Sequence, residues 1–142
     1  MKTWKMFLGL LLLMGSSVSD AQQLAFPGAS GWGRFATGGR TGVVYHVTNL
    51  NDAGVGSLRD AVSQPNRIVV FDVSGVIRIN SRIVFAKNLY VAGQTAPGEG
   101  VTVYGDGVSF SGADNIIVRY MRFRMGAVGT KDKDCAGVAN GQ

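Results

Sequence analysis

Histidine, cysteine and proline are scarce in this sequence, which has one, one and three of them in 142 residues. With His46 as the only histidine, far in sequence from Cys135, a cysteine nucleophile, a Ser-His-Asp hydrolase and a histidine-rich zinc site are all disfavoured. His46 lies within an apolar strand pattern and is expected to be structural. Cys135 is expected to be a buried free thiol or to pair with a cysteine beyond Gln142.

Long apolar runs are also missing after the first residues. Two lysines precede the run Met6–Met14, which is too short to span a bilayer, and small residues favour cleavage after Ala21. We therefore expect residues 1–21 to be a signal peptide and residues 22–142 to be one secreted domain. A membrane anchor is the alternative, but no second run of spanning length follows.

The charge balance excludes little. The formal net charge is +5, which suits an acidic polysaccharide and is equally ordinary for a soluble protein. Basic and aromatic residues do not alternate as they do in nucleic-acid-binding proteins, so no nucleic acid is expected as a partner.

Glycine, in contrast, is abundant, with 21 residues, and separates short apolar segments. Val, Ile, Phe and Tyr dominate these segments, as in half-buried strands. Strands are predicted over the segment VVYHVTNL and over Arg67–Asp72, Val76–Ile79, Arg82–Phe85, Leu89–Ala92, Val101–Tyr104, Val108–Phe110 and Ile116–Met125.

One short helix is predicted in the segment GSLRDAV. Ser57 can cap its first turn, Asp60 stands three residues later as in a capping box, and Pro65 follows its end. Leu58, Ala61 and Val62 form its apolar face.

The strands repeat. Asn88 and Asn115 each open an apolar strand, and their positions differ by 27 residues (115 − 88). Repeats of roughly 20–50 residues are typical of solenoids, in which each unit buries its apolar face by stacking on its neighbours. The apolar parity of Ile116–Met125 changes near Met121 and Arg122, as where a chain turns from one sheet into another.

A β-sandwich is the alternative fold, but only Asp106-Gly107 offers a hairpin turn and the spacing is uneven. We predict an all-β, right-handed parallel β-helix. Its amino-terminal helix covers the first rung, and no equivalent cap follows at the carboxyl end.

Two segments carry a family resemblance. The segment Ala25–Val62, AFPGASGWGRFATGGRTGVVYHVTNLNDAGVGSLRDAV, resembles the amino-terminal cap of extracellular pectate lyases of polysaccharide lyase family 1. Around Arg119–Gln142, the string VRYMRFRMG, which begins at Val118, followed by KDKDCAG resembles their third-rung region. The resemblance implies a pectin lyase-like β-helix of which this chain is the amino-terminal part.

Two aspartates are the candidate metal ligands. Asp132 and Asp134 are one residue apart, and paired carboxylates can converge on Ca²⁺, which prefers six to eight oxygen ligands. Their spacing alone fits a solvated loop equally well, because lysines alternate with them. In the family a D-x-D pair at the matching positions helps hold Ca²⁺, so the resemblance implies calcium binding by both.

The resemblance also implies the reaction. Pectate lyases cleave polygalacturonate by β-elimination, in which calcium acidifies the proton α to the uronate carboxylate and an arginine removes it. That arginine and the remaining carboxylates are expected beyond Gln142, so no catalytic residue is assigned here and this chain alone is expected to be inactive. An acidic polysaccharide is the expected partner, and a monomer the expected state.

Other candidates are interpreted as structural. Arg122 and Arg124 are expected to project outward as surface residues, with carboxylate binding as the lesser alternative, and Arg119 is given no catalytic role. The glycine-rich turns lack the Lys-Ser/Thr of a phosphate loop. Trp32 and Phe35 are expected to pack beneath the entry segment, with sugar stacking by Trp32 as a minor option.

Two further functions remain open. One is a relative that cleaves methyl-esterified pectin without calcium. The other is a β-solenoid that binds carbohydrate without catalysis, which would bind polyuronate and release no unsaturated product.

Overall fold

The computed structural model describes residues 22–127 and 134–138. Two 3-10 turns, one helix and ten strands follow in the order η1 (Trp32–Phe35), β1 (Val43–Val47), α1 (Leu58–Val62), β2 (Arg67–Phe71), β3 (Gly75–Ile79), β4 (Ile83–Val84), β5 (Leu89–Ala92), η2 (Gly93–Thr95), β6 (Val101–Gly105), β7 (Val108–Ser109), β8 (Ile117–Arg119), β9 (Met121–Met125) and β10 (Ala136–Gly137). None of the described helices is long and apolar enough to cross a membrane.

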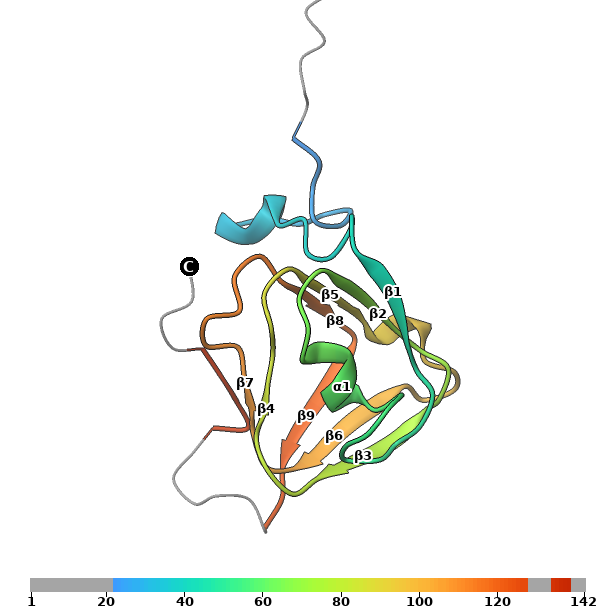
Figure 1. Cartoon of the computed structure of the whole chain (residues 1–142). Helices are drawn as coiled ribbons and strands as arrows, with labels where there is room; N and C mark the ends of the chain where they lie inside the picture. The colour runs from blue at the N-terminus through green and yellow to red at the C-terminus, as the bar shows by residue number, and fades with distance from the viewer. Residues whose placement is uncertain (1–21, 128–133, 139–142) are drawn as a thin grey trace, which may run out of the picture.

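The strands form three sheets that wind around a common core (Figure 1). Their orders are β1-β2-β5-β8, β3-β6-β9 and β4-β7-β10, and every pairing between described strands is parallel. From β2 onward, consecutive strands lie in different sheets, so β5, β6 and β7 stack on β2, β3 and β4 as the next rung. The predicted parallel β-helix is therefore confirmed, and the β-sandwich is wrong.

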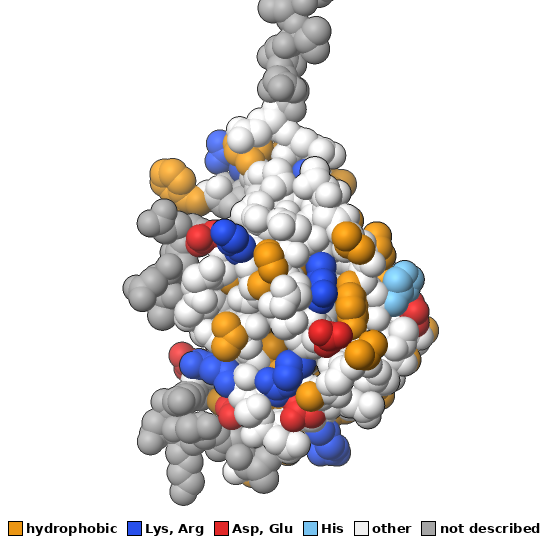
Figure 2. All heavy atoms as spheres, viewed as in Figure 1, with side chains coloured by type: hydrophobic (Ala, Val, Ile, Leu, Met, Phe, Trp, Pro, Cys, Tyr) orange, Lys and Arg blue, Asp and Glu red, His pale blue; other side chains and the backbone are white. Residues whose placement is uncertain are grey.

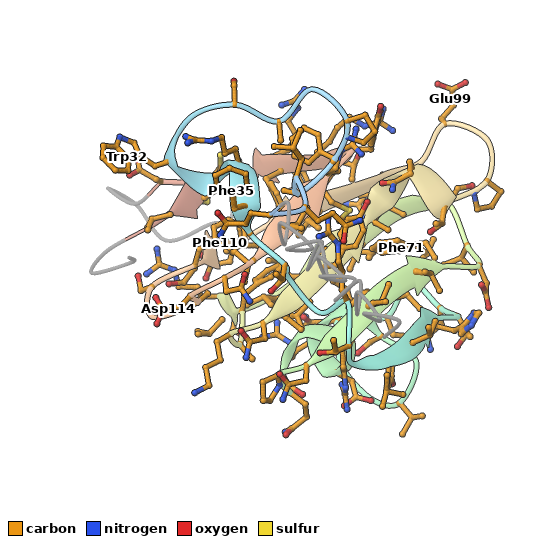
Figure 3. All side chains as sticks on the ribbon, turned by 90° about the horizontal axis from the view of Figure 1, so that it is seen from above. Trp32, Phe35, Phe71, Glu99, Phe110 and Asp114 are labelled. Atoms are coloured by element: carbon orange, nitrogen blue, oxygen red, sulfur yellow. The ribbon has the colours of Figure 1, made fainter. Side chains whose placement is uncertain are left out.

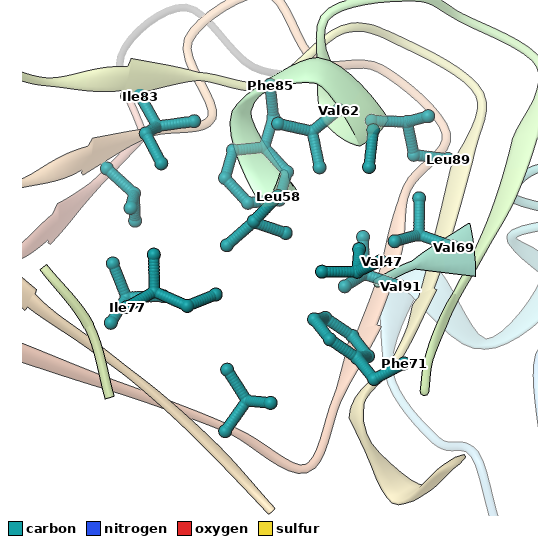
Figure 4. Packing of buried hydrophobic residues seen from close by; sticks show 14 of the residues in the cluster. Val47, Leu58, Val62, Val69, Phe71, Ile77, Ile83, Phe85, Leu89 and Val91 are labelled. Carbon is teal, nitrogen blue, oxygen red and sulfur yellow. The ribbon is translucent and has the colours of Figure 1, made fainter. Parts of the chain in front are cut away.

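Side chains from the inner faces of the three sheets fill the core (Figure 4). Val69 pairs with Val91 in one sheet and Ile77 with Val103 in another, and all four are at most 1% exposed. The phenyl rings of Phe85 and Phe110 lie 4.6 Å apart between centroids, and Phe123 continues the row at 6.0 Å. Each rung thus buries its apolar face against the next.

The helix α1 covers the first rung, as predicted. Leu58, Ala61 and Val62 are completely buried and α1 contacts β1, β2 and β4. Ser57 caps the helix by accepting a hydrogen bond from the amide of Asp60 at 3.2 Å. The reciprocal half of the predicted capping box is wrong, because the Asp60 carboxylate accepts from the Tyr45 hydroxyl and the Ser57 amide donates to Gly54.

The segment 24–40 crosses the sheet β1-β2-β5-β8 before β1 begins (Figure 1). The Arg40 guanidinium donates to the carbonyls of Leu24 and Ala25 at 2.6 and 2.7 Å. Asn115 fixes its other end, since Oδ1 accepts from the amides of Thr37 and Gly38. The entry segment is therefore bound to the rung that contains β8. This contact joins residues that are far apart in the sequence, so local sequence patterns could not predict it.

The predicted strand Ile116–Met125 is in fact two strands in two sheets. Tyr120 forms the corner between β8 and β9 with φ 57°. The change of apolar parity thus correctly indicated a corner, one residue before the predicted point. Asp106-Gly107 likewise forms a corner between β6 and β7 instead of a hairpin, and the Gly107 amide donates to the Asp106 carboxylate.

Candidate functional site

The strand register places three arginines, Arg78, Arg122 and Arg124, on the outer face of the sheet β3-β6-β9. Arg78 pairs with Tyr104 and Tyr104 with Arg124 along one row, and Val76, Thr102 and Arg122 form the neighbouring row. The alternate residues of these strands, such as Ile77 and Val103, point into the core. Because a strand's side chains alternate between faces, both rows project outward. The outward positions predicted for Arg122 and Arg124 are confirmed.

On this basic face, the side chains of Arg122 and Arg78 contact neutral groups. Arg122 Nε donates to Thr102 Oγ1 at 3.0 Å, and its terminal nitrogen donates to the backbone carbonyl of Glu99. The Arg78 guanidinium lies 5.3 Å from the centre of the Tyr104 ring. The salt bridges His46–Asp72 and Arg59–Asp52 lie elsewhere. An anionic ligand would find two of these cations already positioned.

A loop borders this face on one side. Residues 93–100 connect β5 to β6, whereas the next rung makes the same corner with Tyr120 alone. A hollow of about 490 Å³ lies between the loop and β9, lined by Gly93, Gln94, Ala96, Gly98, Glu99, Gly100, Tyr120, Met121 and Arg122. Gly93 is required there, because a Cβ at this position would lie 2.5 Å from the Tyr120 carbonyl oxygen. The loop carries Glu99 outward at the margin of the molecule (Figure 3).

The candidate calcium ligands follow β9 along the chain. Asp134 is exposed and lies two residues before β10. The carbonyl of Cys135, the residue between Asp134 and β10, accepts a hydrogen bond from the Val108 amide at 2.9 Å. Asp132 lies outside the described residues. In residues 22–127 and 134–138 no three acidic, histidine or cysteine residues gather as a metal site.

The chemistry of Asp134 nevertheless fits calcium. The residue is exposed and lies two residues before β10, which pairs with β7. An exposed carboxylate is a suitable hard oxygen ligand, yet one such group is far from the six to eight oxygens that Ca²⁺ takes. A calcium site that included Asp134 would therefore need Asp132 and further oxygen ligands.

The remaining candidates are placed in structural contacts. Arg119 lies half-buried between the rings of Phe26 and Tyr120, with its guanidinium 4.3 and 5.1 Å from their centres. It holds the entry segment against β8. Cys135 is half-buried and forms no disulfide among the described residues.

His46 pairs with a single carboxylate, as expected of a structural histidine. Its Nδ1 lies 2.9 Å from Asp72 Oδ1, and both side chains are about half exposed. Figure 2 shows this histidine in pale blue at the surface, beside an acidic side chain. For Trp32, in contrast, the predicted packing beneath the entry segment is wrong. Its side chain is fully exposed and does not pack beneath the entry segment, because glycines on both sides allow η1 to turn the indole outward.

Together these features define the chain as the capped first rungs of a parallel β-helix that presents a basic, loop-bordered face. Comparison with known proteins gives the particular family. The chain is 64% identical over 119 residues to the probable pectate lyase C of Aspergillus oryzae, covering 84% of this chain and 28% of that protein. It is 58% identical over 132 residues to the namesake of Aspergillus fumigatus, covering 93% and 31%. It is 58% identical over 134 residues to that of Aspergillus terreus, covering 94% and 32%.

The chain is therefore homologous to fungal pectate lyases, which confirms the resemblance found in the sequence. It spans about a third or less of the length of these relatives. No protein-family model matches it.

Proposed function

We propose that this chain is part of a secreted pectate lyase that cleaves polygalacturonate by calcium-dependent β-elimination. Support comes from the relatives named pectate lyase and from the basic face of β3-β6-β9. That face is the observation that carries the proposal, since three arginines in two rungs suit a polymer with one carboxylate per sugar.

In this proposal the chain's own residues bind and orient the substrate. Arg78, Arg122 and Arg124 contact uronate carboxylates along the stacking direction of the rungs, where neighbouring strands are about 4.8 Å apart. Tyr104 lies between two of these arginines and supplies a ring face for a sugar. The Glu99 loop forms one wall and limits how the chain can slide sideways.

Asp132 and Asp134 are proposed to hold calcium next to this face. The ion, when bound, withdraws charge from a uronate carboxylate and so acidifies the proton α to it. Asp134 would contribute one carboxylate from the segment just before β10, and Asp132 a second. Removal of the proton and departure of the glycosidic oxygen are assigned to groups that the described residues do not supply.

Secretion is part of the same proposal. Residues 1–21 are taken to be removed, which leaves a soluble monomer that begins at Gln22. An extracellular location suits a substrate that is itself a large acidic polymer.

The test is binding, because the chain alone is not expected to turn over substrate. Residues 22–142 are titrated with oligogalacturonate with and without calcium, by calorimetry at low salt. We expect calcium-strengthened binding, and a loss of about tenfold in affinity when Arg122 and Arg124 are both changed to Ala. Lys87→Ala removes a surface cation from the β4–β5 connection and serves as the control.

An assay for unsaturated product distinguishes the calcium-dependent lyase from the two other candidate functions. Calcium-dependent release of unsaturated galacturonate by a longer form that includes this chain is expected. Activity that survives chelation and prefers methyl-esterified pectin indicates the calcium-independent relative instead. Binding with no product in either form indicates a non-catalytic β-solenoid. If the arginine substitutions leave the affinity for oligogalacturonate unchanged, the basic face does not bind the substrate.

A further inference from the structure

A hollow of about 420 Å³ lies where the entry segment crosses the outer face of the sheet β1-β2-β5-β8 (Figure 1). It is called the entry pocket below, and its walls are residues 23–27 and Arg40 on one side and Tyr90 and Arg119 on the other. Tyr90 projects outward from β5, because its neighbours in sequence are buried in the core. The volume lies within the range of roughly 300–1,000 Å³ that is typical of small-molecule pockets.

Arg40 is a positioned cation in this pocket. Its Nη2 donates to the backbone carbonyls of Leu24 and Ala25 at 2.6 and 2.7 Å. Both hydrogen bonds come from one nitrogen, whereas a guanidinium has five N–H donors on three nitrogens. Neutral groups thus fix the side chain of Arg40, and its other two nitrogens carry further donors.

Arg119 brings a second cation from β8. Its guanidinium lies 4.3 Å from the centre of the Phe26 ring and 5.1 Å from that of Tyr120, so both contacts are to neutral rings. An arginine held in this way by aromatic rings can still donate to a carboxylate through its N–H groups. The side chain is half-buried, and an ion pair formed there is stronger than one in open water.

The remaining walls of the entry pocket are neutral. No carboxylate is among the lining residues that the structure describes. Leu24 and Pro27 are exposed apolar side chains, and the Tyr90 ring is half-buried. The Tyr90 hydroxyl accepts a hydrogen bond from Gln94 Nε2 at 3.1 Å, so it can donate its own proton to a ligand. The pocket therefore combines two cations, an aromatic ring and a hydroxyl donor.

We propose that the entry pocket is a second binding site for an acidic sugar, in which Arg40 and Arg119 bind the carboxylate of a uronate and its ring lies against Tyr90. Charge-assisted hydrogen bonds from arginine suit a carboxylate, and an aromatic ring suits the C–H face of a sugar. An inorganic anion uses only the arginines, and a neutral sugar uses only the ring. A uronate uses both, which makes the pocket selective for it.

The entry pocket and the basic face lie on different sheets, β1-β2-β5-β8 and β3-β6-β9. No bond is broken in the entry pocket, so its role would be to hold an acidic polymer at a distance from the cleavage site. It is independent of the proposed lyase function, because it uses only residues of the entry segment, β5 and β8. Failure of either proposal leaves the other standing.

The test uses residues 22–142 carrying Arg122→Ala and Arg124→Ala, which weakens binding to the basic face. This chain is titrated with galacturonate, with galactose and with inorganic phosphate, and NMR follows the Nε–H signals of the arginines. We expect saturable shifts of the Arg40 and Arg119 signals with galacturonate. Galactose and phosphate should bind at least about tenfold more weakly.

Variants made in the same background assign the binding by calorimetry. Arg119→Gln should weaken galacturonate binding about tenfold. Tyr90→Leu, which keeps both cations and the contact of Arg119 with Phe26, should weaken it about fivefold. Arg34→Gln is the matched control, since Arg34 also lies on the entry segment and covers an aromatic ring at 4.5 Å but does not line the pocket. Its affinity should equal that of the background chain.

Three results would overturn the proposal. The first is equal affinity for phosphate and galacturonate, which would mean that the arginines bind any small anion. The second is galacturonate binding that leaves the Nε–H signals of Arg40 and Arg119 unmoved. The third is an equal loss of affinity in Arg34→Gln and Arg119→Gln, which would reflect net charge instead of a pocket. The NMR titration requires no change in the pocket, so its outcome does not depend on how well the pocket variants fold.

Discussion

Asn88 and Asn115, 27 residues apart in sequence, are joined directly: Asn115 Nδ2 donates to Asn88 Oδ1 at 2.9 Å. Asn88 Nδ2 in turn donates to Asn66 Oδ1 at 3.0 Å. All three asparagines have φ between 53° and 59°, the left-handed region in which asparagine is more readily accommodated than most residues. One row of side chains therefore turns the corner of each rung and ties the rungs together.

Asn88, in the middle of this row, should be the most sensitive position. Asn88→Ala loses two side-chain hydrogen bonds. It also places alanine, which tolerates the left-handed region less well than asparagine, at φ 53°. We therefore expect the free energy of unfolding to fall by about 2–4 kcal/mol. Asn88→Gly should cost less, because glycine adopts this backbone freely. Urea denaturation measures both. Equal losses in the two variants would mean that the backbone conformation contributes nothing.

Tyr120 occupies a left-handed corner without such a side chain. Its ring contacts the Arg119 guanidinium, and it lacks the side-chain amide through which the asparagines join the rungs. Tyr120→Gly should therefore be neutral or stabilising by up to about 1 kcal/mol, and Tyr120→Ala destabilising by about 1 kcal/mol. Thermal unfolding of the two variants compares them, and a lower midpoint for glycine than for alanine would refute the strain at this corner.

The sequence predicted the local elements well and the long-range contacts poorly. Leu58, Ala61 and Val62 fell on one helical face because the period of a helix is local, and Ser57 was recognisable as a cap. The repeat of Asn88 and Asn115 revealed the rung length. Asn66 belongs to the same row but lies 22 residues earlier, so unequal rungs concealed it.

What was missed depends on contacts between distant residues. Asp60 matched a capping box, yet Tyr45 from β1 takes its carboxylate. Trp32 is a large apolar residue of the kind usually found in a core. Its exposure to solvent follows from the glycines beside it and from the course of the segment 24–40, which the sequence pattern did not show. Ca²⁺ ligation by Asp132 and Asp134 stays a prediction, because it rests on the family resemblance and on residues that lie in part outside the described ones.

The cap helix should be essential for folding. Leu58→Ala removes a completely buried side chain beneath the first rung, and the residual cavity should cost about 3 kcal/mol. Ser57→Ala should cost about 1 kcal/mol through the lost cap. Chemical denaturation reports the stability, and a dye that binds exposed apolar surface reports the uncovered rung. Dye binding that stays unchanged in Leu58→Ala would contradict the covering role of α1.

The loop before α1 should make the free energy of unfolding depend on pH in the acidic range. Arg59 donates to Asp52 Oδ1 at 2.5 Å, and the Asn80 amide donates to Oδ2 at 3.2 Å. Burial raises the pKa of Asp52, but these hydrogen bonds and the charge of Arg59 outweigh it and lower the pKa below its ordinary value of 3.8. A lowered folded-state pKa means that the unfolded chain takes up the proton first. The stabilisation is thus present above about pH 3.8 and is lost as the pH falls through the lower folded-state value.

Asp52→Asn should therefore destabilise the protein at pH 7 by about 1 kcal/mol and have a smaller effect at pH 3. Urea unfolding at the two pH values measures the difference between variant and unaltered chain. Arg59→Met removes the partner, so adding Asp52→Asn to it should cost less than Asp52→Asn alone. If the cost of Asp52→Asn is the same at both pH values, or the same in both backgrounds, the ion pair does not account for the acid dependence. The loop would then be stabilised by the Arg59 contacts to the carbonyls of Ser81 and Arg82 instead.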